Sequence, residues 1–323
     1  MKKLAIKIFV FLLICVLTLP QTAWAAQLLI PGGQVIGMAL EDDSLRVAGF
    51  DDELGASAKE AGLRVGDQIL KINGTPIEKP EDIKAVLRRS DGSVELTIRR
   101  GQKQRKLRLC PSATEQGPKL GVLLKNGVTG IGTVTWYDPQ SGTFGALGHG
   151  VNTPAGSLLQ LKKGSVYDAR VLAVKKGCIG DPGQLMGGVT DGNSLGEISA
   201  NKVQGVFGKM QKKSTMEPMP VAENREIHTG RATILSTVTG DCPREYSVEI
   251  LKIYPSAGKT GRNMLLKVTD EALLETTGGI VQGMSGSPII QDGKLVGAVT
   301  HVLVNDPTTG YGIFIENMLD AAA

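Results

Sequence analysis

The fold of the first half of the chain is decided by residues 58–74, which read Ala58-Lys59-Glu60-Ala61-Gly62-Leu63-Arg64-Val65-Gly66-Asp67-Gln68-Ile69-Leu70-Lys71-Ile72-Asn73-Gly74. The run begins inside a short predicted helix, residues 57–61, which ends at Gly62. Residues 67–72 then predict a strand, and the Asn73-Gly74 pair predicts the tight turn that ends it. A helix, a strand and a turn within so short a run indicate a small α+β domain.

The flanking segments complete this domain. Residues 80–89 begin with proline and acidic residues, carry Ile83 on an apolar face and end in basic residues, which predicts an amphipathic helix. Further strands are predicted at residues 34–40, 45–50, 94–99 and 106–109. We therefore place the first domain at residues 33–110.

The pattern A-G-L-x-x-G-D-x-I-L-x-I-N-G in residues 61–74 closely resembles the centre of PDZ domains. The resemblance implies a groove that takes a peptide C-terminus or an extended strand by adding it to an exposed sheet edge. It assigns the loop that receives the peptide carboxylate to Ile36-Gly37-Met38-Ala39. It assigns one wall of the groove to the helix that carries Ile83.

A second domain is expected after residue 118. Residues 111–118 are polar, contain two prolines and lack periodicity, so we interpret them as an interdomain linker. From residue 119 to residue 323, short strand-like runs recur between glycine turns, and helical periodicity is almost absent. This pattern predicts a two-lobed β-barrel or sandwich, and a chain that is mainly β.

The first 26 residues have the layout of a secretory signal peptide. Lys2 and Lys3 precede an apolar run from Ile8 to Leu19, and the small-residue triplet Ala23-Trp24-Ala25 follows as a cleavage site. The apolar run is short for a membrane-spanning helix, although the same segment also fits an uncleaved signal anchor. In either case we expect the remaining chain to lie outside the cytoplasm.

The composition excludes several classes of function. The 323 residues carry a net charge of +4, and their charged fraction of 21% and hydrophobic fraction of 41% are typical of a soluble globular protein. Because no dense basic stripe is present, no nucleic-acid partner is expected. No group of histidine, cysteine and aspartate residues has the close spacing of metal ligands, so we expect neither a metal nor another cofactor.

The segment with the clearest chemical meaning is Gln282-Gly283-Met284-Ser285-Gly286-Ser287-Pro288. A serine between glycines on a tight turn can expose its hydroxyl and leave its backbone N–H free to point at an oxyanion. The pattern G-x-S-G-x-P resembles the nucleophile turn of chymotrypsin-like serine proteases. That resemblance implies that Ser285 attacks and that the N–H groups of Gly283 and Ser285 form the oxyanion hole.

A serine nucleophile needs a base, and the chain has three histidines. His149 lies between two glycines after an apolar strand, a position suited to a site that substrate must approach, so it is the expected base. His301 extends an apolar strand and is the reserve candidate, whereas His228 is expected at the surface.

A carboxylate should orient the imidazole of the base. Three aspartates preserve the chain order His, Asp, Ser: Asp181, Asp191 and Asp270. The spacing alone does not choose among them.

Together, the signal segment, the PDZ pattern, Gly148-His149-Gly150 and the serine turn strongly resemble the stage IV sporulation protein B family of serine peptidases. The likeness extends to Ala298-Val299-Thr300-His301. It implies a trypsin-like barrel domain with His149 and Ser285 as the catalytic pair, and it places Asp270 where the family's acidic residue is expected. In the wider chymotrypsin pattern the aspartate belongs to the first lobe, and Asp270 departs from that rule.

The family cuts a regulatory membrane protein between the two membranes of the developing spore, which releases an intramembrane protease that activates a late sigma factor. By this resemblance we expect an exported serine endopeptidase with a membrane-bound protein substrate, self-cleavage, and self-association through the PDZ domain. The alternative is a secreted PDZ scaffold on a catalytically inactive β domain. A serine-directed fluorophosphonate separates the two, because only an activated hydroxyl reacts.

Overall fold

The computed structural model describes residues 27–154, 156–211, 216–257 and 261–323, apart from the side chain of Asp191. The predicted signal segment, residues 1–26, lies outside this range. Within the described ranges, no helix has both the length and the apolar character needed to cross a bilayer.

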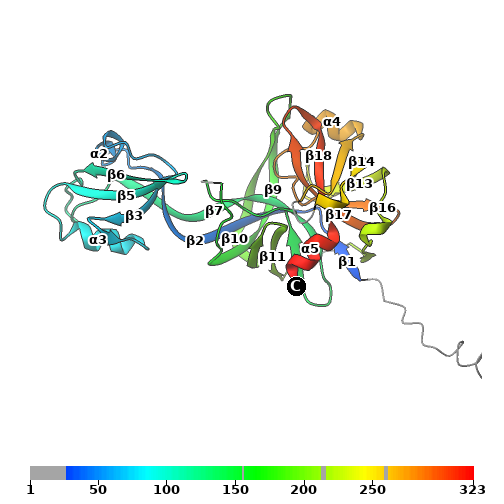
Figure 1. The fold of residues 1–323 in the computed structure, drawn as a ribbon, viewed down its shortest axis with the longest axis horizontal. Coiled ribbons are helices and arrows are strands. Elements are labelled where there is room, and N and C mark those ends of the chain that lie inside the picture. The colour runs from blue at the N-terminus through cyan, green and yellow to red at the C-terminus, as the bar shows by residue number, and fades with distance from the viewer. Residues whose placement is uncertain (1–26, 155, 212–215, 258–260) are drawn as a thin grey trace, which may run out of the picture.

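The molecule consists of a two-lobed β body from which a smaller unit projects (Figure 1). The first lobe is built from β1 (Leu28–Pro31), β2 (Val35–Phe50), β7 (Val122–Tyr137), β8 (Thr143–Ala146), β9 (Lys163–Lys175), β10 (Gln184–Lys202) and β11 (Gly205–Met210). The smaller unit adds α2 (Ala56–Glu60), β3 (Gln68–Ile72), β4 (Thr75–Pro76), α3 (Pro80–Leu87), β5 (Val94–Arg100) and β6 (Lys103–Leu109).

The second lobe contains β13 (Gly230–Ser236), β14 (Arg244–Ile253), η2 (Pro255–Ala257), β15 (Met264–Val268), α4 (Glu271–Thr277), β16 (Pro288–Gln291), β17 (Lys294–Leu303) and β18 (Asp306–Phe314). Between the lobes, the chain forms β12 (Met219–Pro220) and η1 (Asn224–Glu226), and it ends in α5 (Ile315–Ala322).

Each lobe closes on itself as a ring of antiparallel strands. In the first lobe, β2 pairs with both β9 and β7, so the pairing order β2-β9-β10-β11-β8-β7 returns to its start. The second lobe is a closed barrel in the order β13-β14-β15-β18-β17-β16. The predicted mainly β fold with a trypsin-like barrel domain is therefore confirmed.

The smaller unit explains why its sequence pattern is so specific. Asn73 and Gly74 have φ angles of 49° and 80°, the left-handed pair that a two-residue hairpin turn requires. Asp67 is almost fully buried and accepts hydrogen bonds from the Arg100 guanidinium and the Arg64 backbone N–H. The predicted helix forms as α3, and Ile83 packs inside this unit's apolar core.

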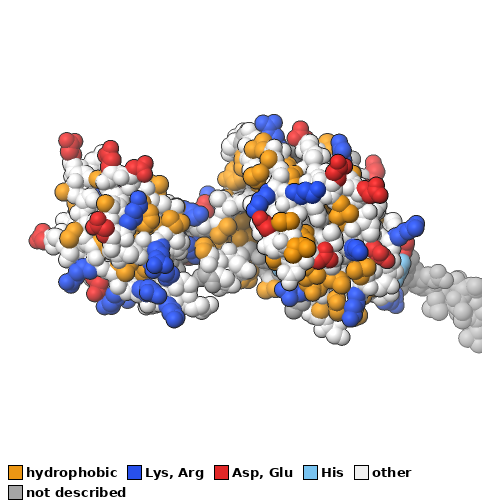
Figure 2. Space-filling model, turned by 90° about the horizontal axis from the view of Figure 1, so that it is seen from above, with side chains coloured by type: hydrophobic (Ala, Val, Ile, Leu, Met, Phe, Trp, Pro, Cys, Tyr) orange, Lys and Arg blue, Asp and Glu red, His pale blue; other side chains and the backbone are white. Residues whose placement is uncertain are grey.

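The boundary between the two units differs from the predicted one. Leu45, Val47 and Leu120 belong to the core of the smaller unit, so this unit is inserted into the first lobe between β2 and β7. Both strands continue from one unit into the other, and the body narrows to a waist there (Figure 2). Residues 111–118 are not a linker between domains, because Ser112 pairs with Lys119 and its hydroxyl donates to the carbonyl of Leu54.

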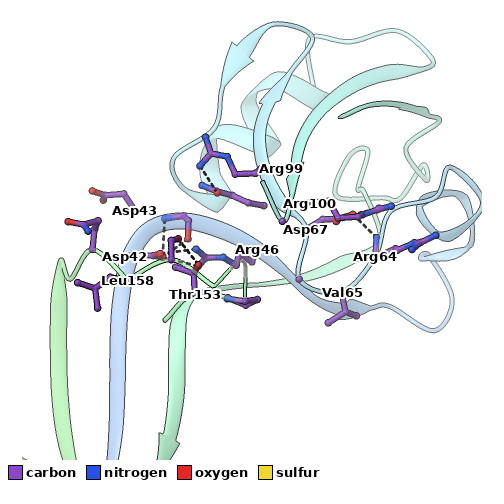
Figure 3. A pocket seen from close by; sticks show the side chains of 17 residues that line it. Asp42, Asp43, Arg46, Arg64, Val65, Asp67, Arg99, Arg100, Thr153 and Leu158 are labelled. Atoms are coloured by element: carbon purple, nitrogen blue, oxygen red, sulfur yellow. Dashed lines mark hydrogen bonds and ion pairs between the residues drawn. The ribbon is translucent and has the colours of Figure 1, made fainter. Parts of the chain in front are cut away.

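The waist contains a buried ion pair (Figure 3). Arg46 donates to both carboxylate oxygens of Asp42, and the backbone N–H of Gly127 donates to the same carboxylate. Burial alone would raise the pKa of Asp42, but the hydrogen bonds from Arg46 and Ser44 outweigh it and the pKa is lowered. Residues 41–44, which separate the two predicted strands, are therefore a bulge inside β2 that this ion pair holds in place.

Candidate active site

The predicted nucleophile lies on a tight turn that only glycine permits. Gly283 and Gly286 have φ angles of 100° and 98°, in the left-handed region. A Cβ atom on Gly286 would lie 2.0 Å from the carbonyl oxygen of Thr133. The turn is thus pressed against β7 of the first lobe, although Ser285 itself belongs to the second.

Two buried threonines of β7 hold this turn. The Thr133 hydroxyl donates to the carbonyl oxygen of Gly283 at 2.7 Å, and the Thr135 hydroxyl donates to that of Gly286 at 2.8 Å. The backbone N–H of Thr133 also donates to the carbonyl oxygen of Ser285 at 3.2 Å. Because the carbonyls of the turn face β7, these bonds fix the orientation of its peptide groups.

The two N–H groups predicted to form an oxyanion hole are free. Among the described residues, neither the Gly283 nor the Ser285 N–H has a hydrogen-bond acceptor, whereas Met284 and Gly286 each donate to a backbone carbonyl. Free, preoriented donors beside a nucleophile can stabilise the negative charge that develops on a carbonyl oxygen during acyl transfer.

The predicted base is held by its own loop. Leu147 and Gly148 have φ angles of 69° and 66°, which turn the chain sharply after β8. The Nδ1 atom of His149 lies 3.0 Å from the carbonyl oxygen of Gly150. Because a carbonyl can only accept, Nδ1 carries the proton, and Nε2 is left with a lone pair. Burial lowers the pKa of His149, so its ring is neutral and able to accept a proton at pH 7.

Ser285, His149 and His301 line one cavity of about 400 Å³ between the lobes. The structure thus brings together the predicted nucleophile and base, which lie far apart in the sequence. The Ser285 hydroxyl donates to the carbonyl oxygen of Thr300 at 2.7 Å, so it rests on β17 and must rotate to reach the imidazole. We call this space the active-site cavity.

The reserve candidate, His301, lies beside the base. The ring centroids of His149 and His301 are 5.2 Å apart. Burial, and then the charges of His149 and Arg262, lower the pKa of His301 to about 4. Its Nδ1 atom is buried and has no hydrogen-bond partner among the described residues.

The structure does not bring the predicted Asp270 to His149. Asp270 is the N-cap of α4, where its carboxylate accepts from the N–H groups of Leu273 at 3.0 Å and Ser247 at 3.2 Å. A capping aspartate before a helix is common, and its sequence signal does not differ from that of a catalytic residue. Of the alternatives, Asp181 forms an exposed ion pair with Lys175, and the side chain of Asp191 lies outside the described part.

The predicted peptide-binding loop is also wrong. Residues Ile36-Gly37-Met38-Ala39 lie inside β2, hydrogen-bonded to β7 on one side and β9 on the other. No N–H row is left there for a peptide, because both edges are already paired. Ile83, the predicted groove residue, is buried. The free edge near the smaller unit is instead at residues 122–126 of β7, which pair only with β2 among the described strands.

The threonines that hold the nucleophile turn were not predicted. Thr133 and Thr135 lie in an ordinary strand-like run, and nothing in the sequence indicates that they contact a turn about 150 positions away. Their role becomes visible only in the folded protein, where the first lobe packs against the turn of the second lobe.

Comparisons with known proteins find both domains, in the chain order PDZ domain and then peptidase. The model of the SpoIVB peptidase S55 family matches residues 116–319, and a PDZ-domain model matches residues 54–100. A search of curated proteins gave no match.

Similar solved structures share little sequence with the chain. The Rv3671c protease from M. tuberculosis, in its active form, is 16% identical with a TM-score of 0.35, over 60% of this chain and 73% of that one. The HtrA-type protease AlgW with a decapeptide is 12% identical with a TM-score of 0.37, over 65% and 57%. The PDZ domain of an SdrC-like protein from Listeria monocytogenes is 20% identical with a TM-score of 0.22, over 26% and 88%.

Proposed function

Because the chain belongs to the SpoIVB peptidase S55 family, and so is a serine endopeptidase with a PDZ domain, we propose that it acts as a regulatory endopeptidase of sporulation. The observation that carries the chemistry is the shared cavity of Ser285 and His149 beside the two free N–H groups. The family supports the biological role.

The geometry supports an acyl-enzyme mechanism. The Ser285 hydroxyl leaves the carbonyl of Thr300, gives its proton to Nε2 of His149 and attacks the peptide carbonyl carbon. The N–H groups of Gly283 and Ser285 bind the oxyanion. His149 then gives the proton to the leaving amine as the C–N bond breaks. Water hydrolyses the ester by the reverse sequence of proton transfers.

The proposed substrate is a membrane-associated regulatory protein in the space between the forespore and mother-cell membranes. Its cleavage would trigger an intramembrane protease and, through it, activation of a late sigma factor. The predicted signal segment, retained or cleaved, would place the enzyme in that compartment. Self-cleavage and self-association are part of the same proposal, since the PDZ domain could hold a second copy of the chain.

The PDZ domain binds a peptide, and we place that peptide at the edge of β7 over Val122–Asn126 rather than at the predicted loop. This edge lacks a strand partner among the described residues, and an extended peptide can add its backbone hydrogen bonds there. The occupant would be a C-terminus or an internal strand of the substrate or of a second copy.

Replacement of the nucleophile tests the catalytic assignment. Ser285→Ala is expected to lower turnover by up to about a millionfold, because the catalytic groups act as a unit. Mass spectrometry of the purified wild type and the variant, side by side, measures self-cleavage and cleavage of an added protein. Ser285→Ala with parental activity would refute the assignment. Absence of fluorophosphonate labelling at Ser285 in the wild type would instead favour the PDZ scaffold.

A further inference from the structure

A second hollow on the first lobe lies next to the active-site cavity. This second hollow has a volume of about 470 Å³ and is lined by parts of β2, β7 and β10. Met38, Gly130 and Ile131 line both spaces, so the two hollows adjoin each other at β2 and β7. We call the combined space the substrate groove.

Among the described residues, the substrate groove carries no carboxylate, ammonium or guanidinium side chain, and its two histidines, His149 and His301, are neutral at pH 7. Among the described residues that line its two parts, none is aspartate, glutamate, lysine or arginine. The hollow at the waist, in contrast, is lined by several such residues, including Asp43, Arg64 and Arg99 (Figure 3). Arg262 influences His301 but lines neither part of the groove. A charged peptide side chain in this groove would lose water without gaining a counter-ion.

One wall of the groove is a strand edge that starts at the nucleophile turn. The backbone N–H of Leu185 in β10 donates to the carbonyl oxygen of Gln282 at 2.8 Å. From Met186 to Val189, β10 pairs with β9 along one edge, and its other edge has no strand partner among the described residues. An extended peptide can add to such an edge.

The groove wall is also unusually apolar for a surface. Met186 is 47% exposed and Val189 is 51% exposed, and both line the second hollow. Met38 and Met186 can adapt to different apolar side chains because the methionine side chain is flexible and polarisable. Met186 and Val189 are uncovered in the free enzyme, which is the condition expected of a surface that a substrate buries.

We propose that this groove selects an extended, uncharged and largely apolar segment of the substrate next to the scissile bond. The proposal rests on the endopeptidase function proposed above and specifies its substrate class. Gly130 is the position that controls the groove. A Cβ atom there would meet nothing within 4 Å, and its φ lies outside the left-handed region, so a side chain at this position, which lines both hollows, would occupy open space without disturbing the strand.

Digestion of a proteome-derived peptide library by the purified full chain, read by mass spectrometry, tests the proposal. Cleavage by the wild type is expected at sites flanked by uncharged, mainly apolar residues. Gly130→Lys should admit acidic residues at one flanking position and Gly130→Asp should admit basic ones, each with a change of preference of about tenfold. Opposite charge preferences in the two Gly130 variants cannot come from loosened packing, because loosened packing would affect both variants in the same way.

Gly192→Lys is the matched control. Gly192 also lies in a strand, also has open space around its Cβ position, and lines neither part of the groove. Its variant should keep the parental preference. Wild-type cleavage beside charged residues at their library frequency, or an unchanged preference in both Gly130 variants, would overturn the groove assignment alone. A wild type that cleaves no peptide and reacts with no fluorophosphonate would overturn the proposed function as well.

Discussion

The imidazole of His149 is oriented by a backbone carbonyl. Like the aspartate of a catalytic triad, this carbonyl keeps the proton on Nδ1, but it carries no full negative charge. The Gly150 carbonyl accepts from Nδ1 and leaves Nε2 as the proton acceptor. It cannot stabilise the imidazolium as strongly as a carboxylate does, because it carries only a partial charge. The neighbouring His301 is neutral until the pH nears 4, so at neutral pH it does not oppose protonation of the base.

The burial of His301 makes the stability of the protein depend on pH. An unfolded histidine binds a proton near pH 6.5, but His301 in the folded protein does so only near pH 4. Between these values the unfolded state holds more protons, so the free energy of unfolding decreases as the pH falls from about 6.5 to about 4. In His301→Phe, the slope of the unfolding free energy against pH should be smaller by the contribution of about one bound proton. Urea unfolding at several pH values across that range measures this slope.

His228 provides a control of opposite sign. It is exposed, and the Thr229 carbonyl followed by the Asp292 carboxylate raises its pKa. It therefore favours the folded state at low pH, an effect that is lost as the pH rises. His228→Asn should steepen the decrease in stability on acidification. A pH profile that is the same for His301→Phe and the wild type would contradict the environment described for His301.

At the level of secondary-structure elements, the two turns that flank β16 differ in whether they can accept a side chain in place of glycine. Gly286 and Gly293 both have left-handed φ angles, 98° and 73°, and lie at the two ends of β16. A Cβ on Gly286 meets the Thr133 carbonyl at 2.0 Å, whereas a Cβ on Gly293 meets nothing within 4 Å.

Alanine at these two glycines should therefore have unequal effects. Gly293→Ala should cost about 1 kcal/mol, the strain of the left-handed conformation alone. Gly286→Ala should cost about 3 kcal/mol or more, because the turn must also move away from β7. Thermal unfolding measures the stability, and fluorophosphonate labelling of Ser285 reports the turn. Equal losses in both variants would show that contact with β7 does not hold the turn.

The sequence predicted the elements whose causes are local. The Asn73-Gly74 turn, the helix from Pro80 and the glycine-bounded serine turn are all as expected, because each depends on residues adjacent in the chain. The partners of β2 could not be predicted in the same way. Residues 34–40 alternate like a strand in either domain, and only pairing with β7 and β9 assigns them to the first lobe.

At the scale of the whole molecule, the buried pair of Asp42 and Arg46 joins the PDZ domain to the first lobe. Asp42→Asn would leave the Arg46 charge buried without its partner, and should lower stability by about 3 kcal/mol. Asp43, the next residue, forms an exposed pair with Lys162, so Asp43→Asn should cost less than about 1 kcal/mol. Urea unfolding measures both. A small effect of Asp42→Asn would mean that the waist does not depend on this pair.

The insertion of the PDZ domain also decides how the enzyme can be divided. β2 and β7 are neighbouring strands of the first barrel, and the inserted unit lies between them in the sequence. A fragment that starts at residue 119 would lack β1 and β2. Its first barrel would be open, because the strand between β7 and β9 would be missing. Expression from residue 119 should therefore give an incomplete barrel and no active protease. Deletion of residues 51–121, with a short linker in their place, would instead keep every strand of the first barrel.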